Sequence, residues 1–208
     1  MKNLAFLLAI IGCQAIYSQN NANYILIVNG DSLKISLNSP FEYKTATGET
    51  LNMEVIQPGI LSYSDKFVSF QYEKEHNISN AKIEEDIEQL MVMKSTGSGF
   101  MVQKYGSIDP SILTDFLLNE VTKESINYGY EKFEEPFLKT LKGGHVVEGT
   151  KATLTYKGET EIYVVAAYGA KDEGIIILTM LLNDEFTEPD SKMIDMFWDT
   201  LVINLKEN

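Results

Sequence analysis

The sequence predicts an α+β fold, an α/β/α sandwich whose central, mostly antiparallel sheet is preceded by N-terminal β-hairpins. Two stretches, 161–169 and 174–182, are apolar at both even and odd positions, so both faces of each predicted strand need cover. An amphipathic segment after Asp109 and an apolar segment after Thr187 have the periodicity of helices. One helix on each face supplies the cover and makes the sheet the middle layer.

The centre of the predicted sheet is an antiparallel meander between Gly149 and Asn183. Its first strand, 149–156, alternates in polarity, so only one of its faces is expected to be fully covered. Turn-type residues at 157–159 and 169–174 separate this strand and the two apolar strands from one another.

The two predicted helices have recognisable ends and apolar stripes. Asp109 can cap the first helix ahead of Pro110, and Gly129 can close it. Its stripe, at i, i+3 and i+4 spacing, contains Leu113, Phe116, Leu117, Val121 and Tyr128. The stripe of the last helix, which Met196 and Trp198 widen, contains Met193, Ile194, Phe197 and Leu201. We expect the last helix to be well buried against the sheet.

The remaining strands are predicted as hairpins and an edge strand. Asn29-Gly30 is a strong tight-turn signal between two N-terminal strands, and a second strand–turn–strand pattern follows it. Pro136 within 133–141 makes that segment an edge strand. The expected strands, apart from the meander, are 24–28, 32–37, 41–44, 51–56, 67–72, 87–93, 100–105 and 133–141, with a charged connection at 73–88.

The order of elements from Phe67 onward resembles the PsbP-like (also DcrB-like) family of small α/β/α sandwiches. The residues that carry the resemblance are 67–70 in the first sheet strand, 149–152 at the start of the meander, 174–180 in its last strand and 193–202 in the closing helix. The resemblance covers residues 67–205 and leaves the N-terminal hairpins outside it. It implies a non-enzymatic adaptor, assembly factor or envelope protein, and it supplies no catalytic residues.

The start of the chain predicts export. A short basic start precedes an apolar run at 4–12, which is too short to span a bilayer as a mature helix. Cleavage is expected between Ser18 and Gln19. The chain then consists of a signal peptide (1–18), a hairpin segment (19–60) and a sandwich domain (61–208), and the mature protein is periplasmic or secreted.

A second maturation stays open at Cys13. Residues 10–13 resemble a loose bacterial lipobox, which would acylate Cys13 and tether the protein to a membrane. Cys13 is the only cysteine, so cleavage at Ser18 would leave a mature chain without a thiol or a disulfide.

The composition argues against two classes of partner. The formal net charge is −13, and all 17 basic residues are lysines. Nucleic-acid backbones need a basic stripe and favour the bidentate guanidinium of Arg, so no nucleic-acid partner is expected. An anionic membrane surface would also repel this acidic chain, which leaves Cys13 as the only expected route to a membrane.

The chain contains no motif that fixes a reactive group. Residues 95–99 are rich in Ser and Gly, but an apolar strand follows them where a phosphate-binding loop needs a lysine and a helix. His76 and His145 lack a metal-ligand spacing, and the acidic runs at 84–88 and 184–190 do not match a calcium loop. We therefore expect no catalytic residue, cofactor or metal.

Aromatic residues near the ends of predicted elements suggest a binding function. Exposed aromatic side chains often anchor protein partners, and the candidates here are Tyr128, Tyr130, Phe133 and Phe137. The sequence thus favours a non-catalytic binding or assembly protein with a partner in the cell envelope. Two alternatives stay open: a carrier of a small molecule or lipid with a pocket between helix and sheet, and a divergent hydrolase.

Overall fold

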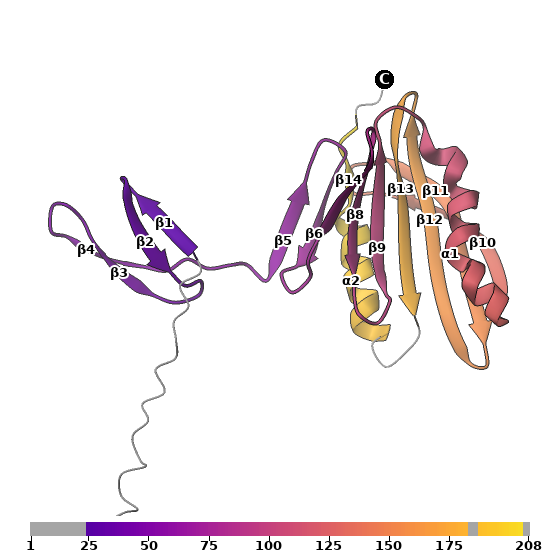
Figure 1. Ribbon diagram of the computed structural model, residues 1–208, viewed down its shortest axis with the longest axis horizontal. Coiled ribbons are helices and arrows are strands. Elements are labelled where there is room, and N and C mark those ends of the chain that lie inside the picture. The colour runs from indigo at the N-terminus through magenta and orange to yellow at the C-terminus, as the bar shows by residue number, and fades with distance from the viewer. Residues whose placement is uncertain (1–23, 183–186, 206–208) are drawn as a thin grey trace, which may run out of the picture. The chain divides into compact units, whose positions relative to one another are not determined.

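The computed structural model describes residues 24–182 and 187–205, and the chain divides into two compact units between Pro58 and Gly59 (Figure 1). The expected cleavage at Ser18/Gln19 and the candidate lipidation at Cys13 lie outside the described residues. In the described ranges, no helix is both long enough and apolar enough to span a bilayer.

The described part of the first unit, residues 24–58, forms two β-hairpins, as the sequence predicts. Asn29 and Gly30 both have a positive φ, 49° and 95°, which is the backbone of a tight two-residue hairpin turn. Ile35 and Tyr43 are its buried apolar residues, and the Tyr43 hydroxyl donates to Asp31. The strands are β1 (Tyr24–Val28), β2 (Asp31–Ile35), β3 (Phe41–Lys44) and β4 (Thr50–Met53).

The second unit is built on a seven-stranded antiparallel sheet with the order β10-β11-β12-β13-β9-β8-β7. Its strands are β7 (Ser79–Glu84), β8 (Ile87–Met93), β9 (Gly99–Tyr105), β10 (Glu131–Thr140), β11 (Val146–Tyr156), β12 (Glu159–Ala170) and β13 (Glu173–Leu182). The predicted meander is confirmed as β11, β12 and β13, and its last strand pairs with β9. The predicted edge strand is β10, which carries Pro136 at the border of the sheet.

Both faces of the central strands are buried, and a helix covers each face. Ile175 and Ile177 of β13 point into one apolar cluster, whereas Ile176 and Leu178 point into the other. The first cluster includes the apolar face of α2 (Thr187–Thr200), and the second includes that of α1 (Thr114–Tyr128). The sheet is therefore the middle layer of this unit.

The first helix ends where the sequence predicts, at Gly129, but α1 begins only at Thr114 and no side chain caps its start. The Asp109 carboxylate accepts a hydrogen bond from the amide of Ser111 at 2.9 Å and caps a short 3₁₀ helix, η1 (Pro110–Leu113), that leads into α1. Gly129 ends α1 with a φ of 117°, and its amide donates to the carbonyls of Ser125 and Ile126.

The predicted stripe of α1 is wrong at two positions. Phe116 and Tyr128 are 66% and 70% exposed, while Leu118 and Thr122 are fully buried. The Thr122 hydroxyl donates to the carbonyl of Leu118 at 2.8 Å, so this polar side chain can face the sheet at little cost. The predicted stripe counts only apolar residues and therefore omits Thr122. The buried face of α1 is rotated about the helix axis relative to the predicted face.

The structure contains a second sheet of three short strands that the sequence does not predict. It consists of β5 (Ile60–Ser64), β6 (Val68–Glu73) and β14 (Val202–Ile203) in the order β14-β6-β5. The segment 67–72 was expected to open the main sheet, but β6 lies in this separate sheet and contacts α2. The predicted charged connection at 73–88 is also wrong, because β7 lies within it.

The core on the α2 face is centred on Phe197. This side chain is completely buried, and its ring stacks on Phe100 with the centroids 4.0 Å apart and meets the edge of Phe70 at 5.3 Å. The predicted stripe of the last helix is confirmed, since Met193, Ile194, Phe197 and Trp198 are all buried.

We expect Phe197→Ala to lower the free energy of unfolding by about 3–5 kcal/mol, because it empties the centre of this cluster. The matched control is Phe116→Ala on α1, which removes an exposed ring and should change stability by less than about 0.5 kcal/mol. Urea titrations of both variants measure the difference. Equal losses in the two variants would contradict the described packing.

Candidate functional site

Two of the predicted binding residues belong to a cluster of three tyrosines at the end of α1. The rings of Tyr128 and Tyr130 lie 6.2 Å apart, and both contact the ring of Tyr156 at 5.2 and 5.3 Å. Tyr128 is the last residue of α1, Tyr130 precedes β10, and Tyr156 ends β11. We call these three residues the tyrosine cluster.

The other two predicted residues do not join this cluster. Phe133 and Phe137 lie on the face of β10 that points away from α1, and Phe137 packs on Trp198 of α2 at 5.3 Å. Phe133 is 66% exposed. The structure therefore separates the expected set into a tyrosine cluster on one face and two phenylalanines on the other.

The tyrosine cluster is held in place by a carboxylate. The Tyr130 hydroxyl donates to Glu159 at 2.7 Å, while Ser125 and Tyr163 both donate to Glu161 nearby. The bond to Glu159, loss of hydration, and the negative charges of Glu159 and Glu161 raise the pKa of Tyr130 to about 12. Tyr130 is thus a neutral hydrogen-bond donor in a negative local field.

A shallow hollow of about 400 Å³ adjoins the cluster. Lys157 lies at its border with the ammonium nitrogen 4.8 Å from the centroid of the Tyr156 ring, in a cation–π contact. The hollow is lined by Gly129, Glu131, Thr155, Tyr156, Lys157 and Gly158. One aromatic ring, a carboxylate, an ammonium group and backbone thus line one open site.

A second and larger hollow lies between α1 and the sheet. Its volume is about 510 Å³, and side chains with hydroxyl or carboxylate groups, including Ser111, Thr114, Asp115, Glu148 and Thr150, line much of it. A lipid tail needs an apolar lining, so this hollow suits a polar ligand better than a lipid.

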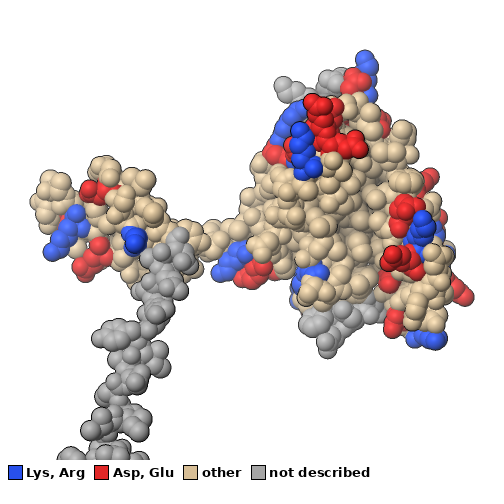
Figure 2. All heavy atoms as spheres, viewed as in Figure 1, with Lys and Arg blue, Asp and Glu red and all other residues tan. Residues whose placement is uncertain are grey.

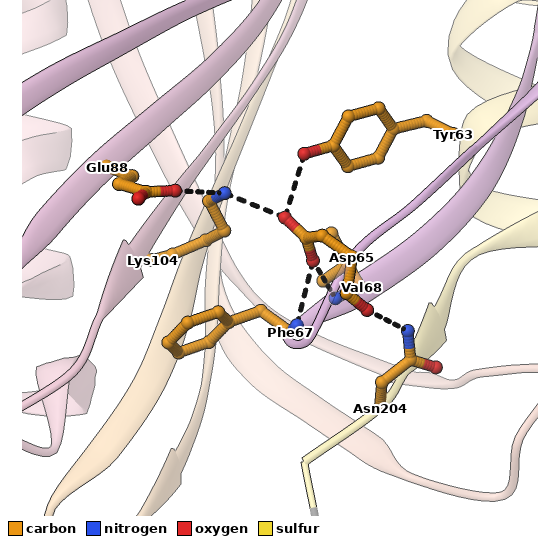
Figure 3. Close-up of polar contacts among 7 residues, drawn as sticks. All are labelled: Tyr63, Asp65, Phe67, Val68, Glu88, Lys104 and Asn204. Atoms are coloured by element: carbon orange, nitrogen blue, oxygen red, sulfur yellow. Dashed lines mark hydrogen bonds and ion pairs between the residues drawn. The ribbon is translucent and has the colours of Figure 1, made fainter.

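A buried lysine joins the small sheet to the main sheet (Figure 3). The side chain of Lys104, in β9, is only 2% exposed, and its ammonium group donates to Asp65 and Glu88 at 2.7 Å each. The Asp65 carboxylate also accepts from the Tyr63 hydroxyl and from the amides of Phe67 and Val68, all at 2.8 Å.

These contacts keep the ion pair charged. Burial lowers the pKa of Lys104 and raises that of Asp65, but the hydrogen bonds between them and to their neighbours outweigh burial. The pKa of Lys104 is therefore raised and that of Asp65 is lowered. A lysine that holds its proton this firmly is a poor nucleophile or base, so the group serves to connect the two sheets.

A similar contact fixes the loop between β8 and β9. Asp190, in the first turn of α2, is fully buried and pairs with the ammonium group of Lys94 at 2.6 Å. The Thr96 hydroxyl donates to the same carboxylate at 2.8 Å. The Ser- and Gly-rich segment at 95–99 is thus part of a hairpin loop, and Thr96 attaches it to the start of α2.

The two histidines lie apart from the tyrosine cluster. The Nε2 atom of His76 lies 3.2 Å from a carboxylate oxygen of Glu73, and His145 meets the edge of the Tyr168 ring at 4.9 Å. Within residues 24–182 and 187–205, no group of three His, Cys, Asp or Glu side chains is arranged to hold a metal ion.

Sequence reasoning missed Tyr156, Glu159 and the Lys104 group. A signal existed for Lys104, because it is the one charged residue in the otherwise apolar and neutral strand 99–105. No comparable signal marks Tyr156, whose contacts depend on how α1 crosses the sheet.

A scan against protein-family models and a search of curated proteins both found no match to this chain.

The Asp65 group predicts a defined response to acid. The folded-state pKa of Asp65 is lower than its unfolded value of about 3.9, so its contribution to stability is present above that value and is lost as the pH falls through the folded pKa. We expect Asp65→Asn to lose less free energy of unfolding than the wild type between pH 5 and pH 3, as measured by urea titration.

The control for this experiment is Asp172→Asn, which changes an exposed carboxylate in the turn before β13. This variant should keep the acid sensitivity of the wild type. The same loss of stability in wild type and Asp65→Asn would show that the ion pair with Lys104 does not contribute.

Proposed function

We propose that the protein is exported and that its second unit is a non-catalytic binding module for a protein of the cell envelope. The observation that carries this proposal is the tyrosine cluster, in which Tyr128 presents a ring that is 70% exposed. Large aromatic rings are preferred anchors at protein interfaces, since they bury much area for few rotatable bonds.

The cluster is arranged before any partner arrives. Gly129 fixes the chain reversal after α1, the bond to Glu159 orients Tyr130, and Tyr156 makes an edge-on contact with the ring of Tyr128. A surface with fixed side chains loses less entropy on binding than a mobile one. This favours recognition of a partner over a purely structural purpose for an exposed ring.

The fold is compatible with the family resemblance. We propose that residues 67–205 form a divergent PsbP-like sandwich, which the mostly antiparallel sheet and the helix on each face support. The separate small sheet that contains β6 is a departure from the expected order of strands. Adaptor and assembly functions in that family agree with a binding surface of this kind.

Export and location remain part of the proposal. The short apolar run at 4–12, followed by polar residues, supports removal of residues 1–18 and release into the periplasm or the medium. Acylation of Cys13 is the alternative, and it would anchor the same binding module to a membrane. Either route brings the second unit to a partner in the envelope.

A carrier function is the second candidate. The observation that favours it is the hollow of about 510 Å³ between α1 and the sheet, with Asp115 and Glu148 in its lining. The ligand would be a polar small molecule and not a lipid, because carboxylates and hydroxyl groups would be left unpaired beside a hydrocarbon tail.

Site-specific photo-crosslinking tests the binding function. We expect benzoylphenylalanine at position 128 to give one discrete adduct with an envelope protein in the cells that produce this chain. The same probe at position 116 is the control, because Phe116 is an equally exposed aromatic residue on the same helix. Mass spectrometry identifies the adduct and the crosslinked segment.

Two results would contradict the proposal. Absence of an adduct at position 128, or the same adducts at 128 and 116, would show that the tyrosine cluster is not the binding surface. Turnover of an ester, phosphate, glycoside or peptide by the mature protein, lost when His145 or a carboxylate is changed, would replace the non-catalytic assignment with a hydrolase.

A further inference from the structure

We infer that the segment that binds the tyrosine cluster is cationic, and that a lysine or arginine side chain of the partner lies on the exposed face of Tyr128. This inference rests on the proposed binding function and names the chemistry of its partner. Three properties of the site favour a cation independently of one another: its ring faces, its carboxylates and its place at the end of a helix.

The ring faces already hold one cation from the chain itself. The ammonium group of Lys157 lies 4.8 Å from the centroid of Tyr156, within the distance at which the negative face of an aromatic ring attracts a positive charge. Tyr128 contacts Tyr156 at 5.2 Å, and its exposure leaves ring surface open to solvent. A partner's cation can therefore make the contact with Tyr128 that Lys157 makes with Tyr156.

The carboxylates around the cluster give it a negative field. Glu131 lines the adjoining hollow, and Glu159 and Glu161 lie close enough to oppose ionisation of the Tyr130 hydroxyl. An electrostatic potential that disfavours the negative tyrosinate form of Tyr130 favours a positive charge at the same place. Figure 2 shows acidic side chains on the surface formed by α1 and its neighbours, with lysines between them.

The end of α1 adds to this field. The carbonyl end of a helix carries a partial negative charge, and cations placed beside it are stabilised. The last turn of α1, which ends at Tyr128, contains no basic residue that could interact with this partial charge. The partner's cation would thus supply the charge that the sequence of the helix lacks at this end.

If the partner supplies a cation, Lys157 competes with it for the negative charge and the ring faces of the tyrosine cluster. It has a positive φ of 49°, a conformation that asparagine tolerates better than most residues, so Lys157→Asn should preserve the turn. The substitution removes a positive charge from the site and frees a ring face. It should therefore strengthen the binding of a cationic segment, whereas it should weaken the binding of an anionic one.

Amide chemical shifts during titration with two capped peptides test the inference. The probes are a peptide of alternating arginine and glycine and a matched peptide of glutamate and glycine. We expect the arginine peptide to shift the amides of Tyr128, Gly129 and Gly158, with an affinity that falls as salt is added. The glutamate peptide should leave them unchanged.

Three variants of the site and one control separate this contact from general attraction to an acidic protein. Tyr128→Ala should weaken binding of the arginine peptide by about two- to fivefold, as expected for an exposed cation–π contact. Tyr128→Phe, which keeps the ring, should bind like the wild type, and Lys157→Asn should bind more tightly. Phe116→Ala is the matched control and should leave the affinity unchanged.

The inference is overturned if the glutamate peptide shifts the same amides, or if Tyr128→Ala and Phe116→Ala have equal affinity for the arginine peptide. It is also overturned if the segment crosslinked to position 128 contains no lysine or arginine, a result that leaves the binding function intact. Absence of any adduct at position 128 counts against the binding function instead, so the two failures are distinguishable.

Discussion

The arrangement of the second unit depends on the burial of β12 and β13 on both faces. Val164 and Val165, adjacent in β12, point into opposite apolar clusters, and the same is true of Ile175 and Ile176 in β13. Strands of this kind are stable only between two covering layers, because either face left open would expose a continuous apolar surface. The helices α1 and α2 satisfy this requirement, one on each face.

The candidate site is a consequence of that packing. Covering one face brings the end of α1 over the turn between β11 and β12, where Tyr128 meets Tyr156. On the other face, charged groups hold two further segments in place. Lys104 of β9 binds Asp65, between β5 and β6 of the small sheet, and Asp190 of α2 binds the loop between β8 and β9. Attraction between the paired charges offsets the free energy lost when they leave water, and the contacts themselves fix where these parts of the unit lie.

The parts of the architecture that local sequence patterns determine could be predicted from the sequence. The meander, the hairpin turn at Asn29-Gly30, the capping by Asp109 and the end of α1 at Gly129 follow from periodicity and from backbone preferences of single residues. The sequence carries no strong signal for the strand β7, because its only apolar residues are Ala81 and Ile83, and Ile83 is itself exposed. The tyrosine cluster was predicted only in part, since Tyr156 joins it through a contact between segments far apart in the chain. Such contacts depend on tertiary packing, which no short pattern encodes.

Native-state amide hydrogen exchange tests the central claim most directly. If burial on both faces of β12 and β13 organises the unit, the amides of Ile176 and Ile177 should exchange only through global unfolding, with a protection equal to the total stability. Amides in the edge strands β7 and β10 should exchange faster through local opening. Protection at Ile176 and Ile177 no greater than in β7 and β10, in a protein of unchanged stability, would contradict the account.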